Sequence, residues 1–287
     1  MIASFKPISA RSRRITAALA LGLMAAACAT VPPASDPAAL AEFEARNDPL
    51  EPTNRVIHDF NQGIDAVLIK PLAEVYHFIL PNFVERRITA ILRNAREPWT
   101  FVNDLLQGET DRAGTTAKRF LTNTTVGLGG MFDVAKDQGL ERHTEDFGQT
   151  LAVWGVDDGP YLVLPFLGSS NPRDAVGTAV GFFADPVSIA QDQANVKGLT
   201  IAVIGTQALD ARARNLDLIE RLKAESIDYY STLRSAYRQE RESDIRNGAP
   251  PEDAPEDDIF EEFEDFEGMD DSPGDNGDEA ALLQLEF

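Results

Sequence analysis

Hydrophobic residues near the start of the folded body recur at helical spacing. Between residues 56 and 68 they are one, three or four positions apart, which is typical of one face of an α-helix. The members of this stripe are Val56, Ile57, Phe60, Ile64, Val67 and Leu68. The polar strip beside it consists of Asn54, Asn61, Gln62 and Asp65. The pattern therefore predicts an amphipathic helix with an apolar and a polar face.

The next segments also have helical patterns. Residues 72–80, bracketed by Pro71 and Pro81, are apolar on most sides, so they must be buried in protein or in lipid. Pro98 lacks an N–H and is expected to separate two helices. The remaining stripes of this half predict helices over 84–95, 99–106 and 113–121.

Glycines interrupt this helical pattern after residue 125. Gly127, Gly129 and Gly130 allow backbone angles that other residues resist, so they are expected to form a hinge or a tight turn. The segment lacks the lysine and hydroxyl of a P-loop, and no strand precedes it.

The second half predicts further helices and little sheet. A helix over 147–154 is expected to open at Thr144 or Glu145, and another begins at 170–172. Residues 161–167 are apolar but contain a proline, which predicts an extended or edge segment. The stretch from 198 to 246 predicts one long helix or two. Since strand signals are weak throughout, the fold class is mainly α.

The N-terminus has the layout of a secretory signal. Four basic residues precede an apolar run from Ile15 to Ala27, which is short for a bilayer span. Small residues then lead into Cys28, the single cysteine of the chain, and the segment resembles a lipoprotein lipobox with Ala25 where leucine is commonest. We expect a signal peptide over 1–27 and lipidation of Cys28, which would anchor the chain to a membrane surface. Cleavage after Ala27 by an ordinary signal peptidase is the alternative.

Charge divides the rest of the chain. The sequence has 26 Lys and Arg against 47 Asp and Glu, a net charge of −21, which argues against nucleic acid as a partner. From 248 to 287 there are 16 acidic and no basic residues, so this segment is expected to be a disordered tail. The predicted organisation is a signal peptide (1–27), a lipidated tether (28–46), one helical domain (47–247) and the acidic tail (248–287).

The sequence offers few groups for catalysis. Its three histidines, His58, His77 and His143, are far apart and outside any metal-binding motif. No serine stands in a nucleophile elbow. We therefore expect a protein that is not an enzyme and that needs no metal or other cofactor.

Three ordered blocks of residues resemble the MlaA (VacJ) family of lipoproteins. They are NDPLEP-x-NR from Asn47, RF-x-x-NT-x-x-G-x-GG-x-FD-x-A from Arg119, and EDFGQTL from Glu145 with the WGV, GPY, LPF-x-G-x-S and RD segments that follow it. The similarity covers residues 47–237 and leaves out the acidic tail. It implies an all-helical ring with amphipathic, membrane-embedded helices, lying in the inner leaflet of the outer membrane around an amphipathic channel.

The resemblance also implies a function. Such proteins remove mislocalised phospholipids from the outer leaflet and pass them to a periplasmic carrier protein, often while bound to a trimeric porin. On this reading the chain is attached by its lipid to the periplasmic face of the outer membrane. The stripe at 56–68 would face the membrane or the channel, its polar strip would line the channel, and the glycines at 127–130 would be a hinge that gates it.

Two alternatives and one partner site stay open. A scaffold lipoprotein for outer-membrane protein assembly needs only exposed protein-binding patches, whereas a channel needs inward polar faces, which the first helix offers. A periplasmic lipid hydrolase lacks a credible nucleophile and base. In the tail, Phe260, Phe263 and Phe266 recur at helical spacing, and the tail either binds the carrier through them or only solubilises the chain.

Overall fold

The computed structural model describes residues 47–193 and 198–250, and most of them are helical. The elements are α3 (Glu51–Ile64), the π-helical turn η1 (Asp65–Ile69), α4 (Lys70–Ile79), α5 (Asn82–Gln107), α6 (Thr110–Thr125), the 3₁₀ turn η2 (Lys136–Gln138), α7 (Phe147–Val153), β1 (Leu162–Leu164), β2 (Gly168–Ser170), α8 (Pro172–Ala184), α9 (Pro186–Gln193), α10 (Leu199–Arg214), α11 (Leu216–Glu225) and α12 (Tyr229–Ile245). The predicted mainly α class is confirmed. The predicted signal peptide, the tether with Cys28, and the tail phenylalanines Phe260, Phe263 and Phe266 lie outside the described residues.

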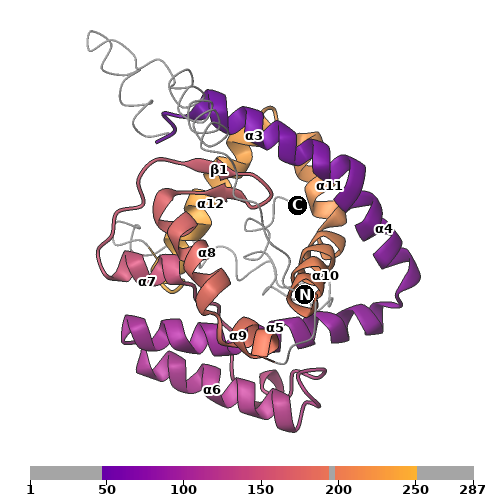
Figure 1. Cartoon of the computed structure of the whole chain (residues 1–287), viewed down its shortest axis with the longest axis vertical. Helices are drawn as coiled ribbons and strands as arrows, with labels where there is room; N and C mark the ends of the chain where they lie inside the picture. Colours follow the sequence, from indigo (N-terminus) through magenta and orange to yellow (C-terminus); the bar gives the residue numbers. More distant parts are fainter. Residues whose placement is uncertain (1–46, 194–197, 251–287) are drawn as a thin grey trace, which may run out of the picture.

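The helices run around a rim instead of stacking in layers (Figure 1). In this view α3 and α4 form one arc of the rim, and α10 and α11 lie along its inner side. The paired helices α5 and α6 form a second side. The third side consists of α7, α8, α12 and the β1–β2 hairpin, and the hairpin contacts α3, which completes the circuit.

Pro71 lies in the first turn of α4, next to the π-helical turn that joins α3 to α4. α3 continues through η1 into α4, because Pro71 occupies the first turn of α4, where its missing N–H is tolerated. The turn between α3 and α4 is π-helical, so it contains one residue more than an α-helical turn. The N–H of Lys70 accordingly donates to the carbonyl of Asp65, five residues earlier. Pro71 thus stands at the beginning of α4 and Pro81 just after its end, as the sequence bracketed this segment.

Pro98 is also accommodated inside a helix. α5 is a single helix of 26 residues that contains Pro98, so the two helices expected over 84–95 and 99–106 are one. An interior proline costs about 3 kcal/mol, which the packing of α6 along the same helix outweighs. α5 ends at Gly108, whose φ of 83° favours glycine.

Two further helix boundaries differ from expectation. The N-cap of α7 is Asp146, not Thr144 or Glu145: its carboxylate accepts from the N–H of Gln149, and the Gln149 side chain accepts from the N–H of Asp146. The stretch from 198 to 246 forms three helices, since Asn215 and the segment around Asp228 end α10 and α11. In both places an Asn or Asp side chain competes for backbone groups.

The predicted extended segment is a two-stranded antiparallel hairpin. Leu162 pairs with Ser170 and Leu164 with Gly168, across a turn that contains Pro165. The expected helix start after it is confirmed, because the side chain of Asn171 accepts from the N–H of Asp174 at the beginning of α8. The hairpin thus connects α7 to α8 while lying against α3.

Candidate functional site

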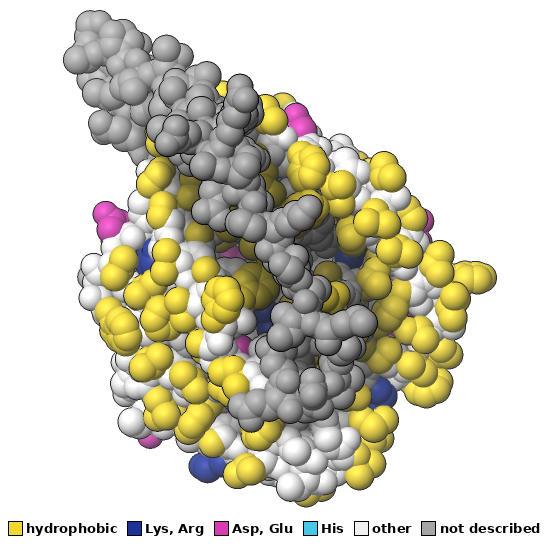
Figure 2. All heavy atoms as spheres, viewed as in Figure 1, with side chains coloured by type: hydrophobic (Ala, Val, Ile, Leu, Met, Phe, Trp, Pro, Cys, Tyr) yellow, Lys and Arg dark blue, Asp and Glu magenta, His cyan; other side chains and the backbone are white. Residues whose placement is uncertain are grey.

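The outer surface of the protein is unusually apolar. Figure 2 shows hydrophobic side chains covering much of the visible face, including the outer edge formed by α4. The largest exposed fractions on α4, the α4–α5 corner and α8 belong to Phe78 (89%), Ile79 (66%), Phe83 (60%) and Phe183 (85%). Soluble monomers rarely expose contiguous apolar patches beyond a few hundred Å². This surface therefore requires an apolar environment or a partner.

The interior of the protein has the opposite character. Among the described residues the largest fully buried side chains are all polar: Arg119, Arg212, Asn54, Asn61, Asn103, Thr116, Thr150, Asp104 and Asp210. The buried apolar cluster is small and aromatic, made of Tyr161, Val163, Tyr230 and Tyr237 with Ile57 packed against it. Buried polar groups must be bonded, so hydrogen bonds and ion pairs hold the interior together.

The polarity of the molecule is thus reversed relative to a soluble globule. Burying each large apolar side chain contributes about 1.5–3 kcal/mol, and here that gain is available only if the outer surface leaves water. Nevertheless, no helix in the ranges 47–193 and 198–250 combines the length and hydropathy that crossing a bilayer demands. The arrangement fits helices that lie in a membrane interface with their apolar sides outward.

The predicted apolar stripe of the first helix follows this outward pattern. Val56, Phe60, Val67 and Leu68 have exposed fractions of 68, 47, 81 and 51%. Ile57 and Ile64 are half-buried, and Ile57 packs against the aromatic cluster. Their assignment to a membrane or a channel stays a prediction.

The predicted polar strip has a different role in the structure from the one expected. Asn54 donates to the carbonyl of Tyr161 and accepts from the N–H of Val163, at 3.0 Å each. Asn61 does the same with Leu164 and Phe166. Both asparagines are buried, and their bonds attach α3 along the hairpin, so their polar atoms are already occupied.

Asp65 is likewise occupied by partners. Its two oxygens accept from Nε and Nη2 of Arg212 on α10 at 2.8 and 3.0 Å, and Lys223 of α11 lies 3.3 Å away. Burial alone would raise the pKa of Asp65, but these two cations lower it below its ordinary value. Of the four strip residues, only Gln62 is left half-buried, and it remains the candidate for a channel lining.

The glycine segment forms a bonded turn at the end of α6. The N–H groups of Gly127, Gly129 and Gly130 donate to carbonyls of Thr122, Thr124 and Asn123. A side chain at Gly130, whose φ is 89°, would collide with Asn94, whereas nothing lies within 4 Å of a Cβ at Gly129. Glycine is thus required for the shape of this turn, and its role as a hinge stays a prediction.

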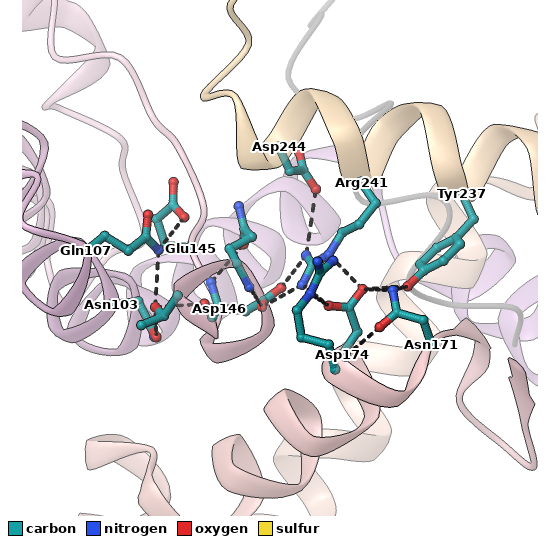
Figure 3. A network of polar contacts seen from close by, with 12 residues as sticks. Asn103, Gln107, Glu145, Asp146, Asn171, Asp174, Tyr237, Arg241 and Asp244 are labelled. Carbon is teal, nitrogen blue, oxygen red and sulfur yellow. Dashed lines mark hydrogen bonds and ion pairs between the residues drawn. The ribbon is translucent and has the colours of Figure 1, made fainter. Parts of the chain in front are cut away.

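An ion-pair network joins α7, α8 and α12 (Figure 3). Arg241 of α12 donates from Nη1 and Nη2 to both oxygens of Asp146 at 2.7 and 2.8 Å, and from Nη2 to Asp174 at 2.8 Å. The hydroxyl of Tyr237 and the side-chain amide of Asn171 also donate hydrogen bonds to Asp174. Burial, followed by the nearby Asp174 carboxylate, raises the pKa of the Tyr237 hydroxyl, which stays protonated as a donor. The network holds the third side of the rim together.

Asp244 lies at the edge of this network, and its buried charge destabilises the folded protein at neutral pH. Burial raises the pKa of Asp244 to about 6; Arg241, 4.0 Å away, opposes the shift, while Asp146, Glu145 and Asp174 add to it. Because the folded state holds this proton more tightly than the unfolded chain, stability falls as the pH rises from about 4 to about 6.

Replacing Asp244 with asparagine should therefore stabilise the protein at pH 7 by about 1–2 kcal/mol, because the variant has no buried charge to accommodate. The gain should vanish below pH 4, where Asp244 is protonated in both states. Thermal unfolding of both proteins between pH 4 and 8 measures this, with the exposed Asp217→Asn as control. A gain that is independent of pH would contradict the assignment.

A group of charged residues at the contact between α5 and α6 was not singled out from the sequence. Glu97 of α5 lies 3.4 Å from Arg119 of α6 and 3.8 Å from Arg142, and burial raises the pKa of Glu97 although both arginines oppose the shift. These residues are far apart along the chain, so spacing gives no signal for the group. As for metals, the part of the chain that the structure describes contains no group of three or more His, Cys, Asp or Glu residues able to hold one.

Known proteins match most of the described body. The model of the MlaA lipoprotein family matches residues 46–244. A Haemophilus influenzae protein named intermembrane phospholipid transport system lipoprotein MlaA is 34% identical over 229 residues, covering 78% of this chain and 90% of its own. The Escherichia coli protein of that name is 34% identical over 211 residues, covering 71% and 80%. An uncharacterised Rickettsia bellii protein is 36% identical over 200 residues, covering 69% and 77%.

The fold matches as well. A solved chain from work on the structural basis for maintenance of bacterial outer membrane lipid asymmetry superposes with a TM-score of 0.61 at 31% identity, covering 69% of this chain and 98% of that chain. The family model spans nearly all of the described body, and the relatives and the solved chain each cover about 70% or more of the chain. The chain therefore belongs to the MlaA lipoprotein family.

Proposed function

We propose that this protein is the outer-membrane lipoprotein of an intermembrane phospholipid transport system. It removes phospholipids that have strayed into the outer leaflet and so maintains lipid asymmetry. The relatives named for this system and the solved chain from work on lipid asymmetry support the proposal. Their family is one of transport lipoproteins, and transfer of an intact lipid requires no catalysis by this chain.

The reversed polarity is the observation that carries the proposal. An apolar outer surface allows the helices to lie among acyl chains, which stabilises the protein in one leaflet. A polar interior tolerates a lipid headgroup that hydrocarbon would reject at a cost of several kcal/mol. A body of this kind is suited to accepting a headgroup on the inside while the acyl chains stay in apolar surroundings.

The proposal also covers how the protein is attached to the membrane, how lipid passes through it and which proteins it contacts. Cys28 carries the lipid that holds the chain on the periplasmic face of the outer membrane. The glycines at 127–130 are the hinge of the passage, and lipid leaves towards a periplasmic carrier protein, with a trimeric porin beside the ring. The apolar tip of the glycine turn, where Val126 and Leu128 are each 65% exposed, gives this loop a surface for lipid or porin.

Outer-leaflet phospholipid should rise in cells that lack this gene, as measured with a lipid-modifying enzyme that acts only at the cell surface. The intact gene should reverse the rise, whereas Cys28→Ala should not, because the protein would lose its anchor. Gly129→Ala meets no neighbouring atom but is strained at a φ of 74°, so it should disturb the turn without a steric clash. Unchanged lipid removal by this variant in the same assay would contradict the hinge. No rise in the deletion strain would favour the scaffold alternative.

A further inference from the structure

A cavity of about 280 Å³ lies where the end of α4, the start of α5 and the junction of α10 with α11 meet. α4 turns into α5 at this corner of the rim (Figure 1). The buried Asp210 of α10 joins the three helices, since it accepts hydrogen bonds from the hydroxyl groups of Tyr76 of α4 at 3.1 Å and Thr89 of α5 at 2.9 Å. Ligand pockets usually measure about 300–1,000 Å³, so this cavity suits a small polar group.

Several charged side chains that line the cavity are already paired within the protein. Nδ1 of His77 lies 3.0 Å from Oε1 of Glu85, and Arg214 donates from Nε to Asp210 at 3.1 Å. These contacts hold the end of α4 to the start of α5 and fix the end of α10. The walls of the cavity are therefore set before any ligand arrives.

Two lining residues of opposite charge have no such partners. Arg86 of α5 and Asp217 of α11 are both exposed. Neither makes a hydrogen bond or an ion pair with any residue that the structure describes, and they do not pair with each other. One small cavity is thus bordered by a free cation and a free anion, and a ligand that carries both signs can satisfy both.

The edge of the cavity is strongly apolar. Phe78 and Ile79 follow the lining residue His77 at the end of α4, and Phe83 follows the lining residue Asn82 at the start of α5. Their exposed fractions are 89, 66 and 60%. A ligand whose charged part lies in the cavity can therefore bury an attached hydrocarbon chain against these side chains, which favours a lipid over a soluble zwitterion.

We propose that this cavity binds the headgroup of a zwitterionic phospholipid with a primary ammonium group. The inference rests on the proposed function and adds to it the headgroup that is recognised. Arg86 binds the phosphate, whose oxygens match a guanidinium fork, and Asp217 accepts from the ammonium. A quaternary ammonium has no N–H to donate and is typically held by aromatic rings, whereas no Phe, Tyr or Trp is among the described residues that line the cavity.

The test uses the full-length protein in non-ionic detergent micelles and calorimetric titration with dihexanoyl phosphatidylethanolamine, phosphatidylcholine and phosphatidylglycerol. The unmodified protein should bind the ethanolamine lipid about tenfold more tightly than the other two, because only its headgroup offers a charged N–H donor besides the phosphate. Asp217→Asn should remove this preference, and Arg86→Gln should weaken binding of all three lipids about tenfold. Glu225→Gln and Arg221→Gln, at exposed positions of α11 outside the cavity, are the matched controls and should change none of the affinities.

Two outcomes would overturn the assignment. Both variants replace exposed side chains without partners, so they should fold, and an unchanged lipid preference in Asp217→Asn would show that this carboxylate does not meet the ammonium. Glycerophosphoethanolamine, which has no acyl chains, should bind about tenfold more weakly than the lipid. If it binds as tightly and displaces the lipid, the cavity is a site for a soluble phosphoethanolamine compound instead.

The outer-leaflet assay separates this inference from the proposed function. If deletion of the gene raises outer-leaflet phospholipid but Asp217→Asn and Arg86→Gln bind the three lipids as the unmodified protein does, the headgroup site fails while the proposed function stands. If deletion causes no rise while the purified protein shows the expected preference, the proposed function fails and the headgroup site stands.

Discussion

Replacing Arg212 with methionine is expected to cost about 3–5 kcal/mol of folding stability, because it leaves a buried carboxylate without its main partner. The side chain of Arg212 is 1% exposed, and that of Asp65, which it binds through two hydrogen bonds, is 4% exposed. Within the described part of the chain, Lys223 at 3.3 Å would then be the one cation left beside Asp65. Because the pair joins η1 to α10, its loss should loosen the α3–α4 arc. Near-UV circular dichroism in one detergent, followed against temperature, measures the change.

Three comparisons separate this effect from a general loss of packing. Lys70→Met breaks a half-exposed ion pair with Glu220 and should cost less than about 1 kcal/mol. The double variant Asp65→Asn with Arg212→Met removes both charges and should recover much of the loss. Finally, the pKa of Asp65 is lowered in the folded state, so its stabilisation is present above pH 4 and is lost as the pH falls through the folded-state value.

The difference between Arg212→Met and the wild type should accordingly shrink on acidification, because a protonated Asp65 no longer needs the cation. A loss below 1 kcal/mol at pH 7, or one that is independent of pH, would show that this ion pair does not hold the arc.

The sequence predicted the helices well and their partners poorly. Spacing alone locates the stripe of the first helix, because periodicity is a local property of the chain. What the polar strip of that helix contacts depends on residues more than 100 positions away: Asn54 and Asn61 bind the hairpin, and Asp65 binds Arg212. Such pairs leave no trace in the spacing, so the strip was assigned to a channel and not to internal contacts.

The wrong helix boundaries have a related cause. Pro98 is a local signal for a helix end, but tertiary packing overrides it inside α5. Conversely, the helix boundaries at Asn215 and Asp228 interrupt a continuous apolar pattern. At each one a single side chain binds a backbone group: Asn215 donates to the carbonyl of Ala211, and Asp228 accepts from the N–H of Ser231. The charged group of Glu97, Arg119 and Arg142 was missed because its members come from α5, α6 and the segment before α7, which only the fold brings together.

A side chain at Gly177 should destabilise the protein strongly, because α7 and α8 cross there with their backbones almost in contact. A Cβ at Gly177 would lie closer than 3.0 Å to the backbone of Gly148, and backbone atoms cannot rotate away. Gly177→Ala should therefore push α7 off α8 and separate Asp146 from the Arg241 network (Figure 3). We expect a loss of about 3 kcal/mol, which exceeds the gain of about 1 kcal/mol in helix propensity.

Gly181→Ala is the matched control one turn later in α8, where the added Cβ would meet the Trp99 ring at an ordinary 3.8 Å. It should leave stability unchanged or raise it slightly, while Gly177→Ala lowers the unfolding midpoint by about 6–12 °C. Equal midpoints for the two variants would contradict the close crossing. If Gly177→Ala unfolds early and also loses outer-leaflet lipid removal, whereas Gly181→Ala retains both, then transport depends on the rim staying closed at this crossing.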